Sequence, residues 1–123
     1  MIKNKKILIL SDDIYEHVRY DNFNFFTIAQ ISKLKDRTLT MNGVSKSYAM
    51  TGWRIGYAAG PKDIIKAIGK IQSQSTSNPS SISQAAAVEA LNGKQGFIKT
   101  RSNAFKARRN FVVKSLNSIK GIN

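Results

Sequence analysis

The most informative stretch of this chain is residues 43–56, which read GVSKSYAMTGWRIG. It places Lys46 in a turn among glycine, serine, alanine and methionine residues, an unusual setting for a solvated surface lysine. Partial burial makes a lysine amine nucleophilic by disfavouring its charged form, as a Schiff-base lysine requires. Arg54 supplies a planar fork suited to a phosphate, and Ser45 and the turn backbone add neutral donors. On spacing alone, an ordinary surface lysine and a structural arginine explain these positions equally well.

Upstream of this stretch lies a short apolar run. Residues 6–10 read KILIL and are followed by a Ser-Asp-Asp sequence. A continuous run of this kind predicts a strand buried on both faces, as in a parallel sheet. Asp12 would then lie at the carboxyl end of the strand, which is where open α/β sheets bind their ligands.

The remaining segments predict further strands and then helices. Residues 27–34 are a candidate short helix, and residues 38–41 a second strand that ends at an Asn-Gly turn signal. Residues 54–59 are a third strand, closed by a Gly-Pro pair. Three strands followed by three helices predict an α/β fold.

Three helices are expected in the second half of the chain. Pro61 opens the first, which fades into a polar run at residues 72–77. Asn78 and Pro79 are read as the cap and first turn of the second. The third spans residues 96–119. Helical spacing predicts these buried positions: Ile64, Ile65, Ile68 and Ile71 in the first helix, and Phe97, Ala104, Phe105, Val112 and Leu116 in the last.

Composition excludes several classes of protein. The 123 residues fit one small domain, and a hydrophobic content of 41% argues against wholesale disorder. The absence of cysteine excludes disulfides, thiolate metal sites and a cysteine nucleophile. The single histidine, His17, argues against a metal cluster. No apolar run approaches the roughly 18 residues of a membrane span, and the first is too short for a signal peptide. We therefore expect a soluble, cytoplasmic protein without membrane partners.

The net charge of +13 raises the question of nucleic acid. The basic residues are scattered, and the chain lacks the aromatic and basic interleaving of RNA-binding sheets, helix-turn-helix spacing and zinc fingers. A solvated basic face, or a piece whose acidic partner is missing, explains the charge better. Charge alone therefore supports nucleic-acid binding, which stays an alternative.

Residues 43–56 resemble, position by position, the pyridoxal-phosphate (PLP) attachment motif of class-I aminotransferases: apolar residue, small residue, lysine, then Ala-Met-x-Gly-x-Arg-Ile-Gly. Upstream, residues 11–16 (SDDIYE) resemble the Asp-x-x-Tyr motif of the same family. Downstream, residues 76–84 (TSNPSSISQ) resemble its next familiar segment. Three motifs in the right order cover essentially the whole chain, and the likeness is to bacterial aspartate aminotransferases.

The resemblance implies a role for each candidate site residue. Lys46 would be the catalytic residue, joined to the cofactor aldehyde and then freed as the base that moves the substrate's α-proton. Asp12 would pair with the pyridine nitrogen as a buried carboxylate and keep it protonated. Tyr15 would donate to the phenolic oxygen. Arg54 would hold the phosphate, with Ser45 as a neutral donor.

One position departs from the family pattern. Some relatives carry a serine three residues before the lysine and use its hydroxyl on the phosphate. Gly43 stands there in this chain. Arg54 and the neighbouring backbone would therefore have to do more of the phosphate binding.

The resemblance also implies how the chain is organised. Residues 1–123 would be part of the PLP-binding large domain of a fold-type I transferase, with a few strands of its mixed sheet and three helices. Residues from about 94 to 123 would lead toward a missing small domain. A phosphate loop, a ring-stacking aromatic and the arginine that binds the substrate α-carboxylate are also missing. We therefore expect a chain that is inactive alone and marginally stable.

The resulting hypothesis is a transaminase segment that uses PLP. It would transfer an amino group between an amino acid, aspartate or similar, and a 2-oxo acid. The family implies a homodimer, and complementing fragments could supply the missing parts. Two alternatives stay open: a non-functional remnant of a split aminotransferase gene, and a basic nucleic-acid-binding module.

Overall fold

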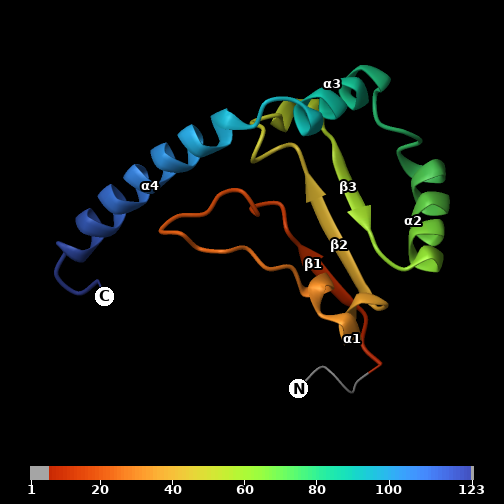
Figure 1. Cartoon of the computed structure of the whole chain (residues 1–123), viewed down its shortest axis with the longest axis horizontal. Coiled ribbons are helices and arrows are strands. Elements are labelled where there is room, and N and C mark those ends of the chain that lie inside the picture. The colour runs from red at the N-terminus through yellow and green to blue at the C-terminus, as the bar shows by residue number, and fades with distance from the viewer. Residues whose placement is uncertain (1–5, 123) are drawn as a thin grey trace.

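The computed structural model describes residues 6–122. Within them a three-stranded sheet has the order β1 (Ile9–Asp12), β2 (Thr38–Gly43), β3 (Gly56–Ala59). β1 pairs parallel to β2, and β2 pairs antiparallel to β3 (Figure 1). The predicted α/β class is confirmed, and the sheet is mixed.

The strands are shifted from their predicted bounds. β1 begins later than predicted and runs on through Ser11 to Asp12, because its ladder pairs Ile9 with Thr38 and Asp12 with Met41. β3 begins only at Gly56, because Arg54 adopts a left-handed conformation (φ 54°, ψ 44°) that no strand accommodates.

A long connection links β1 to β2. It contains a 3₁₀ turn, η1 (Ile28–Gln30), and a short helix, α1 (Ser32–Lys35), where the sequence predicted one helix. The Thr38 hydroxyl, which is buried, donates to the Leu34 carbonyl at 2.8 Å and fastens this connection to the start of β2. A second 3₁₀ turn, η2 (Thr51–Trp53), lies between β2 and β3.

Three helices follow β3: the first lies on the β3 side of the sheet, the second near one end of the sheet, and the third leads away from it (Figure 1). α2 (Lys62–Ser75) begins after Pro61 and continues through most of the polar run where the sequence predicted it to fade. α3 (Ser81–Asn92) begins at Ser81 with Ser80 as its N-cap, so the predicted cap at Asn78 is wrong; the Gln84 side-chain amide donates to the Pro79 carbonyl at 2.9 Å. α4 (Gly96–Asn117) ends slightly earlier than predicted and extends away from the sheet (Figure 1).

The buried core is small. Val44, Ile55 and Ala87 form its cluster, with Tyr48 and Met50 packed against it. It therefore joins the turn after β2, the segment before β3 and helix α3.

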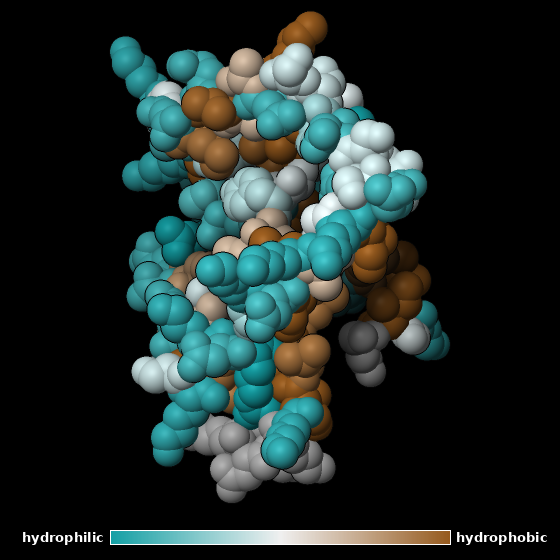
Figure 2. All heavy atoms as spheres, turned by 90° about the vertical axis from the view of Figure 1, so that its right-hand side faces the viewer, coloured by the Kyte–Doolittle hydropathy of each residue, from teal (hydrophilic) through white to brown (hydrophobic). Residues whose placement is uncertain are grey.

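The predicted buried stripes of α2 and α4 are wrong. Neither helix has a buried residue, and Ile71 is 71% exposed. In α4 the predicted stripe is also largely open, as at Phe97, Phe105, Val112 and Leu116. β1 is not buried on both faces either, since Leu10 is 64% exposed. The cause is shared: among residues 6–122 nothing covers these faces, and Figure 2 shows hydrophobic side chains exposed between hydrophilic ones. No helix in the described part of the chain is long and apolar enough to cross a membrane.

Candidate functional site

The parallel pairing of β1 and β2 brings their carboxyl ends to one edge of the sheet. Asp12 is the last residue of β1, and the Asp13 amide donates to the Met41 carbonyl at 2.8 Å just beyond it. β2 ends at Gly43, and Lys46 lies in the turn that follows. Asp12 and the turn of Lys46 therefore leave the sheet from neighbouring strand ends.

The segment after β2 closes on itself over the core. The Val44 amide donates to the Ile55 carbonyl, and the Met50 amide donates to the Val44 carbonyl, both at 3.3 Å. Val44 is fully buried at the base of this loop. These bonds bring Ile55 beside Val44, so Arg54 lies at the base of the loop that carries Ser45 and Lys46.

Gly43 has a steric reason to be glycine. A Cβ at this position would lie 2.9 Å from the Ile55 carbonyl oxygen and 3.3 Å from the Gly56 Cα. Both are backbone atoms at the start of β3 or directly before it, and they have little freedom to move. The place where some relatives carry a serine therefore has no room for any side chain in this backbone.

Arg54 combines an unusual backbone with an available side chain. Its left-handed conformation is uncommon for a residue with a Cβ and tends to occur where the surroundings require it. The guanidinium donates to the Thr51 carbonyl at 2.9 Å and is otherwise exposed. The remaining guanidinium donors can reach a ligand at this edge of the sheet.

The two aspartates after β1 have opposite environments. Asp13 is buried and accepts a hydrogen bond of 2.8 Å from the Ser11 hydroxyl. Asp12 is exposed, and its carboxylate accepts from the Ile14 amide at 3.2 Å. Of the two, Asp12 has the carboxylate that is free to meet a ligand.

The expected burial of the reactive groups is not found. Asp12 and Lys46 are both exposed, because the described residues form one wall of the site and leave its other side open. Tyr15 is 58% exposed and lines a cavity of about 470 Å³ with Tyr20 and Phe25, and Lys46 is not among the residues that line this cavity. The structure therefore brings Asp12, Ser45, Lys46 and Arg54 to one edge of the sheet without enclosing them.

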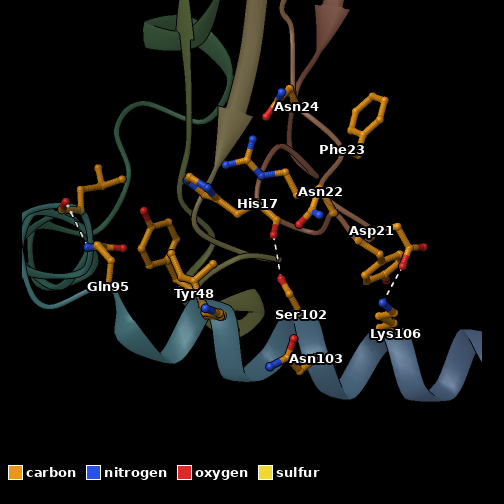
Figure 3. Close-up of a pocket in the computed structure, with 15 residues that line it drawn as sticks. His17, Asp21, Asn22, Phe23, Asn24, Tyr48, Gln95, Ser102, Asn103 and Lys106 are labelled. Carbon is orange, nitrogen blue, oxygen red and sulfur yellow. Dashed lines mark hydrogen bonds and ion pairs between the residues drawn. The ribbon is translucent and has the colours of Figure 1, made fainter.

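A larger cavity, of about 1060 Å³, was not predicted from the sequence. It lies between residues 17–24 on one side and α4 on the other, with Tyr48 and the end of α3 at its border (Figure 3). The five predicted site residues, all of them described, are not among those that line it. No spacing signal could have found this cavity, because its two sides are far apart in the sequence.

An ion cluster ties the two sides of this cavity together. The Asp21 carboxylate lies 2.6 Å from Arg109 Nη1 and 2.5 Å from Lys106 Nζ (Figure 3 includes the lysine contact). Arg109 also lies over the Tyr20 ring, 5.0 Å from its centre. The hydrogen bond from Arg109, followed by that from Lys106, lowers the pKa of Asp21 from 3.8 to about 2.

The charge of Asp21 gives a testable pH dependence. Because the folded-state pKa is depressed, the cluster's contribution to stability is present above pH 3.8 and is lost as the pH falls through 2. We expect Arg109→Gln or Lys106→Gln to raise the pKa of Asp21 toward 3.8, measured by carboxyl-carbon NMR titration. Arg108→Gln is the matched control, since Arg108 lies over Phe105 instead. An equal rise of the Asp21 pKa in Arg108→Gln would contradict the assignment of the low pKa to Arg109 and Lys106.

Tyr48 connects the lysine turn to its neighbours. Its ring makes edge-to-face contacts with two other rings: the centroids of Tyr48 and His17 are 6.4 Å apart, and those of Tyr48 and Phe97 are 6.0 Å apart. Burial, and then the charge of Glu16, raise the pKa of Tyr48. The Ser102 hydroxyl donates to the His17 carbonyl at 2.9 Å, and Arg101 donates to the Ser47 carbonyl at 3.4 Å. The start of α4 therefore contacts both the segment after β1 and the turn of Lys46.

A family model described as "Aminotransferase class I and II" matches residues 1–123. The chain belongs to this family. Curated aminotransferases with similar sequences include an aspartate aminotransferase of Rhizobium meliloti, 58% identical over 99% of this chain and 30% of that protein. An aspartate/prephenate aminotransferase of Cereibacter sphaeroides is also 58% identical, over 99% of this chain and 31% of its own length.

Solved aminotransferase structures have the same arrangement. The crystal structure of the aspartate aminotransferase from Rhizobium meliloti matches with a TM-score of 0.91 and 62% identity, covering 93% of this chain and 29% of that one. The Thermus thermophilus aspartate aminotransferase with maleate matches with a TM-score of 0.86 and 40% identity, over 92% and 30% of the two chains. The resemblance inferred from the three motifs is confirmed. The chain spans about 30% of the length of these aminotransferases, and the roles of its individual residues stay predictions.

Proposed function

We propose that this chain is the cofactor-lysine segment of a transaminase. It would act on an amino acid, aspartate or similar, and a 2-oxo acid, in the cytoplasm. Membership of a family that uses PLP supports the reaction class. The single observation that carries the assignment is the parallel pairing of β1 and β2, which starts Asp12 and the turn of Lys46 from one edge of the sheet.

The donor set at this edge fits PLP chemically. An amine, a carboxylate, a guanidinium and a hydroxyl match the aldehyde, the ring nitrogen and the phosphate of that cofactor. They belong to Lys46, Asp12, Arg54 and Ser45 respectively. When bound, PLP supplies an electron sink for the negative charge that forms at the substrate α-carbon.

Each residue would contribute a separate action. The Lys46 Nζ holds the cofactor aldehyde and afterwards carries a proton to and from the substrate α-carbon. The Asp12 carboxylate keeps a proton on the ring nitrogen. The Tyr15 hydroxyl would donate to the phenolic oxygen. Arg54 and Ser45 bind the phosphate, and Gly43 contributes no hydroxyl to it.

The substrate assignment comes from the relatives' names, which include aspartate and aspartate/prephenate aminotransferases. We further propose that residues 1–123 belong to the PLP-binding large domain of a homodimer, with residues from about 94 onward leading toward a smaller domain. The open apolar faces of α2 and α4 support an activity that needs further polypeptide to cover them.

A chimera tests the proposal. In it, this chain replaces the matching segment of the Rhizobium meliloti aspartate aminotransferase. We expect the 123-residue chain alone to give no amino transfer, because the site is open on one side. We expect the chimera to transfer amino groups at a rate within about tenfold of the parent enzyme, because 58% of the positions are unchanged. The measurement is 2-oxo acid formation with saturating PLP.

Two outcomes would contradict the proposal. A chimera that folds like its parent but neither binds PLP nor transfers amino groups would favour the reading as a non-functional remnant. Turnover by the 123-residue chain itself would contradict the expected need for further polypeptide.

A further inference from the structure

We propose that Glu16 and Asn42 are positioning residues that hold the segment after β1 in register with the turn of Lys46. The Asn42 side-chain amide donates to the Glu16 carboxylate at 2.7 Å, in a partly buried setting. The inference rests on the proposed function, because it assigns this bond the task of setting Asp12 against Lys46.

The segment that carries Glu16 is held in shape by its own turns. The Glu16 amide donates to the Asp13 carbonyl at 2.9 Å, and the Val18 amide donates to the Tyr15 carbonyl at 2.8 Å. The buried Asp13 carboxylate accepts from Ser11 at the end of β1. A shift of the Glu16 side chain would therefore also shift Asp12, because the turns between them hold the backbone together.

Asn42 is placed to act on the other segment. Its amide oxygen accepts a hydrogen bond of 2.7 Å from the Gly43 backbone N–H, while its amide nitrogen donates to Glu16. One planar group thus links the carboxylate to the residue at which β2 ends and the loop of Lys46 begins. Because the amide is rigid, the two bonds fix the direction in which the chain leaves the strand.

The location of the bond explains why it would matter. The parallel ladder ends at the pairing of Asp12 with Met41, and the Asp13 amide adds one last backbone bond. Beyond that point the two segments diverge, and the charge-assisted Glu16–Asn42 bond continues the connection. Catalytic groups that are misplaced by about 1 Å can lose on the order of a hundredfold in rate.

The first arm of the test uses the chimera and hydrogen–deuterium exchange. We expect Glu16→Ala to speed amide exchange at residues 43–47, and Asn42→Ala to speed it at residues 13–18, each by about tenfold. Glu89→Ala, an exposed glutamate on α3, is the control and should change neither segment. Unchanged exchange at residues 43–47 in Glu16→Ala and at residues 13–18 in Asn42→Ala would overturn the proposal.

The second arm measures PLP affinity in the chimera. Glu16→Ala and Asn42→Ala should each raise the dissociation constant of PLP about tenfold, and the double variant should be no worse than either alone. Glu16→Gln keeps an oxygen that accepts from Asn42 and should restore most of the affinity. A purely structural role would lower the thermal midpoint without changing PLP affinity.

The outcomes separate the two proposals. If the unsubstituted chimera does not bind PLP, the proposed function fails, and the present inference fails with it. If it binds PLP, but the Glu16 and Asn42 variants bind equally well or their effects simply add, only the present inference is wrong.

Discussion

Replacing Lys46 by alanine is expected to reduce amino transfer by the chimera at least about a thousandfold, or roughly 4 kcal/mol of transition-state stabilisation. The substitution removes both the amine that holds the cofactor aldehyde and the base that moves the α-proton. It should also abolish the absorbance band that marks covalent attachment of PLP. Steady-state turnover and an absorbance scan measure the two effects independently.

Lys66→Ala is the matched control. Lys66 is an exposed lysine on α2, and removing its charge should leave the rate within about twofold. Lys46→Arg keeps a positive charge but offers no amine for attachment, and it should be nearly as inactive as the alanine variant. If Lys46→Ala retained more than a tenth of the rate, Lys46 would not be the catalytic residue.

Adding one methyl group at Gly43 is expected to destabilise the fold by about 1–3 kcal/mol. The new Cβ would lie 2.9 Å from the Ile55 carbonyl oxygen, so the strands β2 and β3 would have to separate locally. The same shift would move Val44, which is fully buried, and the turn of Lys46. We therefore expect Gly43→Ala to lower both the urea midpoint of the chimera and its affinity for PLP.

Gly69→Ala makes the same chemical change, but it is expected to stabilise the fold. Gly69 lies within α2, and a Cβ there meets nothing within 4 Å. Alanine in a helix interior is favoured over glycine by roughly 0.5–1 kcal/mol, so this variant should raise the urea midpoint. A Gly43→Ala protein as stable as the parent would mean that the two strands are less closely packed than described.

Much of the fold could be predicted because local signals decide it. Pro61 precedes α2, as helix chemistry requires, whereas the predicted turn at Asn42 and Gly43 is wrong, because both residues belong to β2 and pair with β3. Boundaries were less predictable, because pairing partners set them: β1 extends to Asp12 through its ladder with β2. The prediction that α4 is buried was wrong. Amphipathic spacing indicates which face of a helix is suited to burial, but the face is buried only if a neighbouring element covers it.

The candidate site divides in the same way. Lys46 and Arg54 could be identified from the motif at residues 43–56, and Asp12 from the motif at residues 11–16, through their resemblance to one family. Their exposure could not be predicted, since it depends on what lies across the open side of the site. The cluster of Asp21 with Lys106 and Arg109 could not be predicted either, because no sequence pattern shows that a loop aspartate pairs with two basic residues of a distant helix.

The order of the strands has a mechanical consequence for the reactive amine. Among residues 6–122, β2 is the only strand that is hydrogen-bonded along both flanks, so fraying it means breaking two ladders at once. Lys46 lies in the turn directly after that strand, so its backbone is attached to the strand of this segment that is hardest to unpair.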